Sequence, residues 1–178
     1  MQQPAELGPR EARPAERAKR PVTGLAGLYG HPLHPALVAI PIGAWIASFV
    51  FDVASHLAAD PVVFAQGARW LIGIGVLGAL AAAMIGLLDL LAIPTGTRAF
   101  RTALLHMSLA LTATTLYAIG FAIRDAEPTG PVPAVPMVLS AAALLALGAT
   151  GALGGTLAYR YGVRVVDETT QADGFRKT

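Results

Sequence analysis

Four long apolar segments constrain the fold of this chain more than any other feature of its sequence. They cover residues 35–57, 67–93, 100–123 and 135–159. As α-helices they would be roughly 34–40 Å long, enough to cross a hydrocarbon core about 30 Å thick with some tilt. No segment carries a polar face, which disfavours a water-soluble bundle. Proline or glycine occurs in each short connection, where we expect the helices to end.

The composition agrees with a membrane protein. Charged residues make up 13% of the 178 residues and hydrophobic residues make up 54%. A chain with so few charges lacks the polar surface that a soluble domain needs. We therefore predict an all-α fold, an integral membrane four-helix bundle over residues 30–160 in which short loops make successive helices antiparallel neighbours.

Polar segments flank this region. Residues 1–29 are rich in proline, alanine, glutamate and arginine and lack apolar periodicity, which predicts a disordered basic tail. Residues 161–178 are also polar, and we expect them to form a second, frayed tail.

The basic residues predict the orientation of the bundle. Eleven of the thirteen lysines and arginines lie in the two tails and in the connection between the second and third segments, which share one side of the predicted topology. Arg69 and Arg124 are the two on the opposite side. Because short cytoplasmic loops are enriched in lysine and arginine, we expect both tails to be cytoplasmic. We therefore expect a multi-pass protein of the bacterial inner (plasma) membrane. Because this topology already explains the basic tail, we expect no nucleic-acid partner.

Three ionisable residues from different segments share the cytoplasmic leaflet in this topology. They are His34, Asp89 and His106, and His31 precedes them at the interface. Ionisable groups at membrane depth are costly and usually face the protein interior, a partner or a pathway. Each also has a plain structural interpretation, because His106 and Asp89 could be hydrogen-bonded to each other and His34 could simply end a loop.

A second polar position lies near the outer end of the first segment. Asp52 and His56 are four residues apart and share a helix face. Arg69, at the outer start of the second segment, is the residue that we expect to form a structural ion pair with Asp52. His34 and Asp52 are roughly 27 Å apart along a helix, so the two positions cannot form one small site.

Two further features concern helix packing. Pro41 lies inside the first segment, where it should kink the helix, and Trp45 follows on the same face to fill the kink. Small residues line one face of the second and of the fourth segment, which predicts close helix contacts inside the monomer or between copies in a homo-oligomer. These residues are Gly75, Gly78, Ala82 and Gly86, and Gly148, Gly151 and Gly155.

Two stretches carry a resemblance to a known family. GHPLHPALVAIPIGAWIASFVFD begins at residue 30, and GLLDLLAIPTGTRAFRTALLHM begins at residue 86. Together they resemble bacterial membrane proteins grouped as domain of unknown function 2231. The resemblance implies a four-helix membrane domain and no established activity. Some members of the family look fused to a Rieske-type iron–sulfur domain, which hints at electron transfer, but this sequence contains no cysteine.

The sequence leads to three hypotheses for the function, and it does not favour an enzyme. It has no Ser, His and Asp set at one depth and no glycine-rich phosphate loop. In the first, a redox subunit with a redox partner protein binds haem b through His34 and His106, beside Asp89. In the second, His31 joins these three residues to bind or conduct zinc or iron. In the third, the bundle is a non-catalytic membrane anchor or scaffold for a partner, and its polar groups only hold the helices together.

Overall fold

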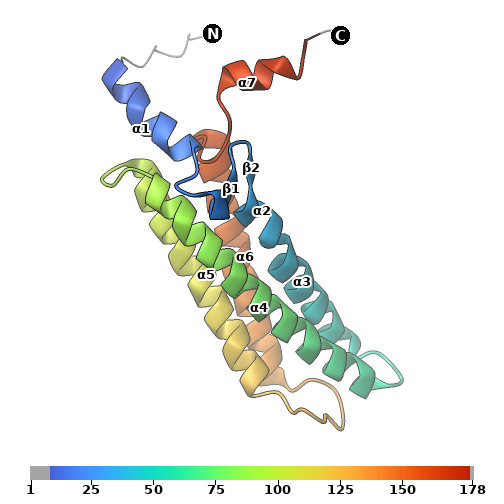
Figure 1. Ribbon diagram of the computed structural model, residues 1–178. Coiled ribbons are helices and arrows are strands. Elements are labelled where there is room, and N and C mark those ends of the chain that lie inside the picture. Colours follow the sequence, from blue (N-terminus) through green and yellow to red (C-terminus); the bar gives the residue numbers. More distant parts are fainter. Residues whose placement is uncertain (1–8, 177–178) are drawn as a thin grey trace, which may run out of the picture.

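The computed structural model describes residues 9–176 and shows a bundle of long antiparallel helices (Figure 1). The first span is divided into α2 (Leu33–Leu37) and α3 (Ala39–Ala54), and the others are α4 (Pro61–Ala92), α5 (Arg98–Ala122) and α6 (Ala134–Gly155). By length and hydropathy these make four spans that could cross a membrane. The four-helix bundle predicted from the sequence is confirmed, and the chain is a multi-pass membrane protein.

Local signals explain where the helices begin. Asp60 accepts a hydrogen bond from the amide of Val62 and precedes Pro61, so α4 begins six residues before the expected residue 67. Thr97 caps α5 in the same way through the amide of Phe100. A side chain that satisfies a free amide of the first turn favours the start of a helix at that point. A proline at the first position favours it too, because its missing N–H has no helical partner there.

The first span is interrupted at Val38, three residues before Pro41. Pro41 has no N–H with which to bond the carbonyl of Leu37, and its ring crowds that carbonyl. The helix is therefore interrupted about one turn before the proline at which the sequence predicts a kink. Trp45 is buried about two helical turns after the break and packs against Gly75 of α4.

The bundle is built from two helix pairs. α3 packs closely along α4, and α5 packs closely along α6, whereas contacts between the two pairs are fewer. We call the interface between these pairs the seam. Trp45 of α3 and Tyr117 of α5 stack across the middle of the seam, with their ring centroids 4.3 Å apart and an interplanar angle of 13°. Both side chains are almost fully buried, so this contact forms the core of the bundle.

The predicted small-residue face of α4 is used inside the monomer. A Cβ atom at Gly75 would meet Trp45, and one at Gly78 would meet Ile40. On α6, by contrast, a Cβ atom at Gly148 or Gly151 would meet nothing within 4 Å among the described residues. The glycines of α4 thus let α3 approach closely, and a homo-oligomer through α6 remains a prediction.

Both tails fold over the same end of the bundle, which we call the tail end; the opposite end is the loop end (Figure 1). The N-terminal segment contains α1 (Pro9–Lys19), the 3₁₀ turn η1 (Gly24–Ala26) and the hairpin of β1 (Gly27–Leu28) and β2 (His31–Pro32). The C-terminal segment contains the π turn η2 (Thr156–Arg160) and α7 (Glu168–Asp173). The molecule is therefore mostly helical rather than all-α.

Within residues 9–29 and 161–176, the tails differ from the disordered and frayed segments that their composition suggested; residues 1–8 and 177–178 lie outside the described residues. The amide of Arg164 donates to the carbonyl of Ala18 at 2.9 Å, and the hydroxyl of Tyr29 donates to the carboxylate of Asp167 at 2.8 Å. Ala18 is buried in a small cluster with Ile93. Partners so far apart in sequence leave no local pattern, so composition alone missed this order. We call the joined segments the tail clasp.

The close approach of α3 to α4 gives a first prediction. Gly75→Ala should lower the free energy of unfolding by about 1–3 kcal/mol, because the new methyl group collides with the indole of Trp45. Gly148→Ala is the matched control and should be neutral or stabilising by up to about 1 kcal/mol, since alanine favours a helix. Denaturant unfolding in detergent measures both. Equal effects of the two substitutions would contradict the packing described here.

Candidate functional site

Two imidazoles face each other across the seam near the tail end. His34 comes from α2 and His106 from α5, and their ring centroids lie 6.2 Å apart with an interplanar angle of 77°. His34 Nδ1 lies 2.8 Å from the carbonyl oxygen of Ala82, and His106 Nδ1 lies 2.9 Å from that of Thr150. Each histidine is thus bonded to a helix of its own pair, α4 or α6.

These hydrogen bonds define which ring nitrogen of each histidine carries a proton. A carbonyl oxygen only accepts hydrogen bonds, so Nδ1 of each ring must carry a proton and donate it. In a neutral imidazole the other nitrogen, Nε2, then holds a free electron pair. Both rings therefore have the tautomer that a ligand of a metal needs at Nε2.

Glycines make room for both rings. A Cβ atom at Gly86 of α4 would lie 2.9 Å from His34 Cε1, and one at Gly154 of α6 would lie 3.2 Å from His106 Cε1. Real Cβ atoms are rarely found so close to another atom, so each ring packs directly on the backbone of its neighbouring helix. The spacing of small residues in α4 pointed to Gly86, whereas nothing in the sequence singled out Gly154.

Asp89 lies beside this pair but binds a different partner. Its carboxylate oxygen Oδ1 is 2.8 Å from Nε of Arg164, which reaches in from the tail clasp. Both side chains are almost completely buried. Asp89 therefore does not pair with His106, which was one interpretation of the sequence. Arg164 was missed because it lies beyond the last apolar segment and looked like one more basic residue of the tail.

His31 does not join this group. It is exposed on β2, in the hairpin of the tail clasp. Within residues 9–176, no three histidine, aspartate or glutamate side chains lie close enough together to hold a metal ion. The structure thus brings His34 and His106 together, with Asp89 at their side, and leaves His31 out.

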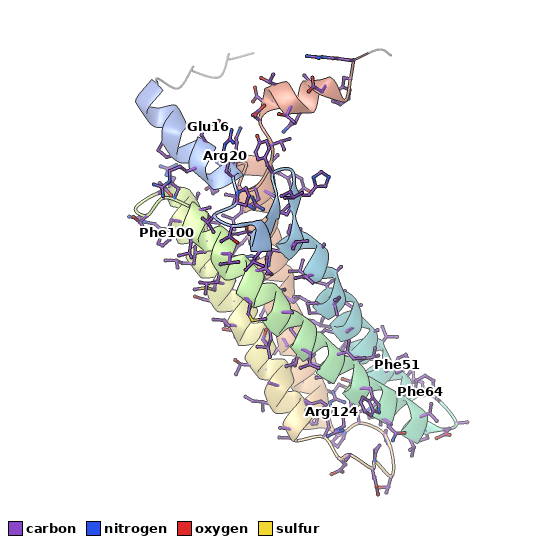
Figure 2. The ribbon with its side chains drawn as sticks, in the orientation of Figure 1. Glu16, Arg20, Phe51, Phe64, Phe100 and Arg124 are labelled. Atoms are coloured by element: carbon purple, nitrogen blue, oxygen red, sulfur yellow. The ribbon has the colours of Figure 1, made fainter. Side chains whose placement is uncertain are left out.

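A second polar cluster lies at the loop end, where Figure 2 shows Arg124 at the far end of the bundle from Glu16 and Arg20. Arg124 Nη1 and Nη2 donate to the two carboxylate oxygens of Asp52 at 2.8 and 2.7 Å, and Nη2 also lies 3.1 Å from the hydroxyl of Ser140. This bidentate pair joins α3 to the end of α5 and is shielded from solvent.

The ion pair predicted between Asp52 and Arg69 is therefore wrong. Arg69 instead places its guanidinium 4.4 Å from the ring centroid of Phe121, in a cation–π contact. Both arginines lie at the depth of Asp52, and only the lateral packing of the helices decides which one reaches it. His56 bonds through Nε2 to the carbonyl of Val132 at 3.0 Å and has a structural role in the adjoining loop.

The fold and these polar clusters define a multi-pass membrane protein whose helix pairs meet around buried polar groups. The chain belongs to a family described as predicted membrane protein, domain of unknown function 2231, whose model matches residues 30–167. This confirms the resemblance seen in the sequence, and the match takes in all four spans and Arg164. No curated protein and no solved structure matches the chain.

The loop-end cluster gives a second prediction. Arg124→Gln should lower the free energy of unfolding by about 3–5 kcal/mol, because it leaves the buried charge of Asp52 without a partner. The double variant Asp52→Asn/Arg124→Gln should recover part of that loss, and Arg69→Gln, the matched control, should cost less than Arg124→Gln. Denaturant unfolding in detergent measures all three. A larger loss for Arg69→Gln than for Arg124→Gln would contradict the pairing.

The tail clasp gives a third prediction, which concerns acid. Hydrogen bonds from the Thr170 amide and then from the Tyr29 hydroxyl lower the pKa of Asp167 to about 2, from an ordinary value of 3.8. Because the folded carboxyl has the lower pKa, its contribution is present above about pH 4 and is lost as the pH falls toward 2. Hydrogen exchange in α7 should therefore speed up over this range in the wild type.

The matched variant for that experiment is Asp167→Asn. It should remove the acid-dependent part of the exchange, after correction for the intrinsic effect of pH on exchange rates. If the variant retains the same acid response as the wild type, another group controls the clasp.

Proposed function

We propose that this chain is a redox subunit of the bacterial inner membrane that holds haem b between His34 and His106, near the cytoplasmic face. The carrying observation is that the two rings face each other across the seam, each with Nδ1 bonded to a backbone carbonyl. Metal-binding histidines almost always donate their other ring N–H to such a group, which fixes the ring and makes it a better ligand.

The distance between the rings supports a shared metal. Two ring nitrogens bound to one ion at about 2.0–2.1 Å each lie roughly 4 Å apart, which places the ring centroids roughly 6 Å apart. The observed separation of the His34 and His106 centroids is 6.2 Å.

The number of ligands favours haem over a bare zinc or iron ion. A structural zinc site takes four protein ligands, and a catalytic zinc site takes three. Here two imidazoles converge, because His31 is exposed and Asp89 is engaged by Arg164. Two imidazoles would suffice to hold haem, because the porphyrin would supply the remaining donors to the iron. The donor set of this seam therefore fits haem better than the four-residue metal site considered from the sequence.

The chain and the cofactor have separate tasks in this proposal. Haem iron supplies one-electron chemistry, so a redox partner protein or small carrier must deliver or accept the electron. In this proposal the chain fixes the tautomer of both rings through the carbonyls of Ala82 and Thr150. The excess of basic residues at the tail end supports a cytoplasmic location for both tails and hence for this site.

An absorption spectrum tests the proposal. Full-length protein purified in detergent from a haem-replete host should show a Soret band and sharp bands on reduction. His34→Ala and His106→Ala should each lose these bands, because each removes one axial ligand. His31→Ala is the matched control, since that histidine is exposed on β2, and it should retain the spectrum.

Metal analysis of the same samples separates the remaining hypotheses. Near-stoichiometric zinc or iron without a Soret band would replace haem by a metal-binding or permeation site. If neither haem nor metal is bound, the haem proposal fails and the anchor or scaffold hypothesis takes its place. A Soret band that survives both His34→Ala and His106→Ala would place the haem elsewhere.

A further inference from the structure

A groove follows the surface between α4 and α5, which run side by side (Figure 1). Val76 and Leu80 of α4 form one wall, and residues of α5 from Leu111 to Ala122 form the other. Its volume is about 500 Å³, and its lining is apolar except for two threonines of α5. Most of the lining residues are exposed, so the groove opens on the outer surface of the bundle. Because both helices are membrane spans, that surface faces the hydrocarbon chains of the bilayer.

The groove is about as long as one leaflet of the bilayer is thick. Leu111 and Ala122 lie roughly 16 Å apart along α5, and half of a hydrocarbon core about 30 Å thick is about 15 Å. Ala122 is the last residue of α5 and lies at the loop end. The groove therefore extends from the loop end to about the middle of the membrane. A void would deprive its walls of dispersion contacts, so a chain that fills the groove is favoured.

Arg69 lies next to the loop end of this groove. It precedes Val76 by seven positions and Leu80 by eleven, so the three residues share one face of α4. Its guanidinium lies over the ring of Phe121 on α5, 4.4 Å from the ring centroid. Phe121 directly precedes Ala122, where the groove ends. A positive charge thus lies just beyond the apolar lining, at the end where the membrane interface begins.

Arg69 has no anionic partner among residues 9–176. Arg124 and Arg164, which are buried, each bind a carboxylate, but none of the ion pairs in that part of the chain includes Arg69. The side chain of Arg69 is half-buried and its Nε is enclosed without a hydrogen-bond partner, whereas Nη1 and Nη2 are not enclosed. A cation close to hydrocarbon is costly without an anion beside it. The ring of Phe121 stabilises this charge but does not neutralise it.

We propose that Arg69 and the groove bind one anionic phospholipid, whose phosphate contacts the guanidinium and whose acyl chain lies along the groove. The planar fork of arginine donors matches the oxygens of a phosphate and can bind two of them at once. Arg69 and Val76 lie roughly 10 Å apart along α4, which leaves room for the glycerol ester between phosphate and chain. An anionic headgroup is favoured over a zwitterionic one, because a zwitterion brings its own cation close to Arg69.

Native mass spectrometry tests this site. Full-length protein in detergent is titrated with phosphatidylglycerol and with phosphatidylcholine of the same acyl chains, and the fraction of protein with one bound lipid gives each dissociation constant. Arg69→Gln removes the contact with the phosphate. Ala118→Trp, at an exposed position in the wall of the groove, fills the space of the acyl chain. The matched controls are Arg160→Gln and Ala149→Trp, at exposed positions outside the groove. Circular dichroism and gel filtration check that all four variants remain folded.

The wild-type protein should bind phosphatidylglycerol more tightly than phosphatidylcholine. Arg69→Gln should reduce this preference by roughly tenfold, the effect of about one charge-assisted hydrogen bond. Ala118→Trp should weaken the binding of both lipids, because the indole occupies the place of the acyl chain. Both controls should bind the two lipids as the wild type does.

Three results would overturn the proposal. If the wild type shows no preference, or if Arg69→Gln keeps it, Arg69 does not bind the phosphate. If Ala118→Trp binds both lipids as the wild type does, the acyl chain lies elsewhere. A wild-type dimer that binds no lipid and becomes monomeric in Ala118→Trp would assign the groove to a second copy of the chain. None of these results bears on haem binding, because the groove and the histidine pair are tested by separate measurements.

Discussion

The burial of polar side chains between helices is the constraint on which the rest of this structure depends. In a membrane such groups find their partners within the protein or lose considerable free energy. Here they are paired across or beside the seam, by Asp52 with Arg124 at the loop end and by Asp89 with Arg164 at the tail end. The stack of Trp45 on Tyr117 lies between them. These contacts set how the two helix pairs meet and hence how far apart the two histidines lie.

The arrangement of the bundle as two helix pairs also explains how the orientation of each histidine ring is fixed. Each ring is held by a carbonyl of its own pair, so neither depends on the other for its orientation. Contacts between the pairs are fewer than contacts within each pair, and the proposed haem would lie in the seam between them. Because each histidine belongs to a different pair, the separation of the two rings depends on how the pairs pack against each other, and a metal site needs that separation to be held closely.

The sequence predicted the spans well because hydropathy and caps act locally. It also placed His34, Asp89 and His106 at one depth, since short loops fix where each helix starts. It predicted Arg69 instead of Arg124 as the partner of Asp52, because both arginines lie on the same side of the predicted topology and only the packing of the helices shows which one reaches the carboxylate. It missed Arg164 and the order of the tails for a related reason. Tyr29 and Asp167 are bonded across 138 positions, and no local pattern records such a contact.

The tail clasp has a consequence for how the molecule is made. Arg164 follows all four spans in the chain, so it reaches Asp89 only after the last helix has been synthesised. Until then the tail end lacks the segment that covers Asp89, one helical turn from His34. A growing chain thus passes through a stage in which His34, His106 and Asp89 are present and Arg164 is not. The residues that follow the fourth span bring Arg164 to Asp89, so the order of residues along the chain sets the order in which these contacts form.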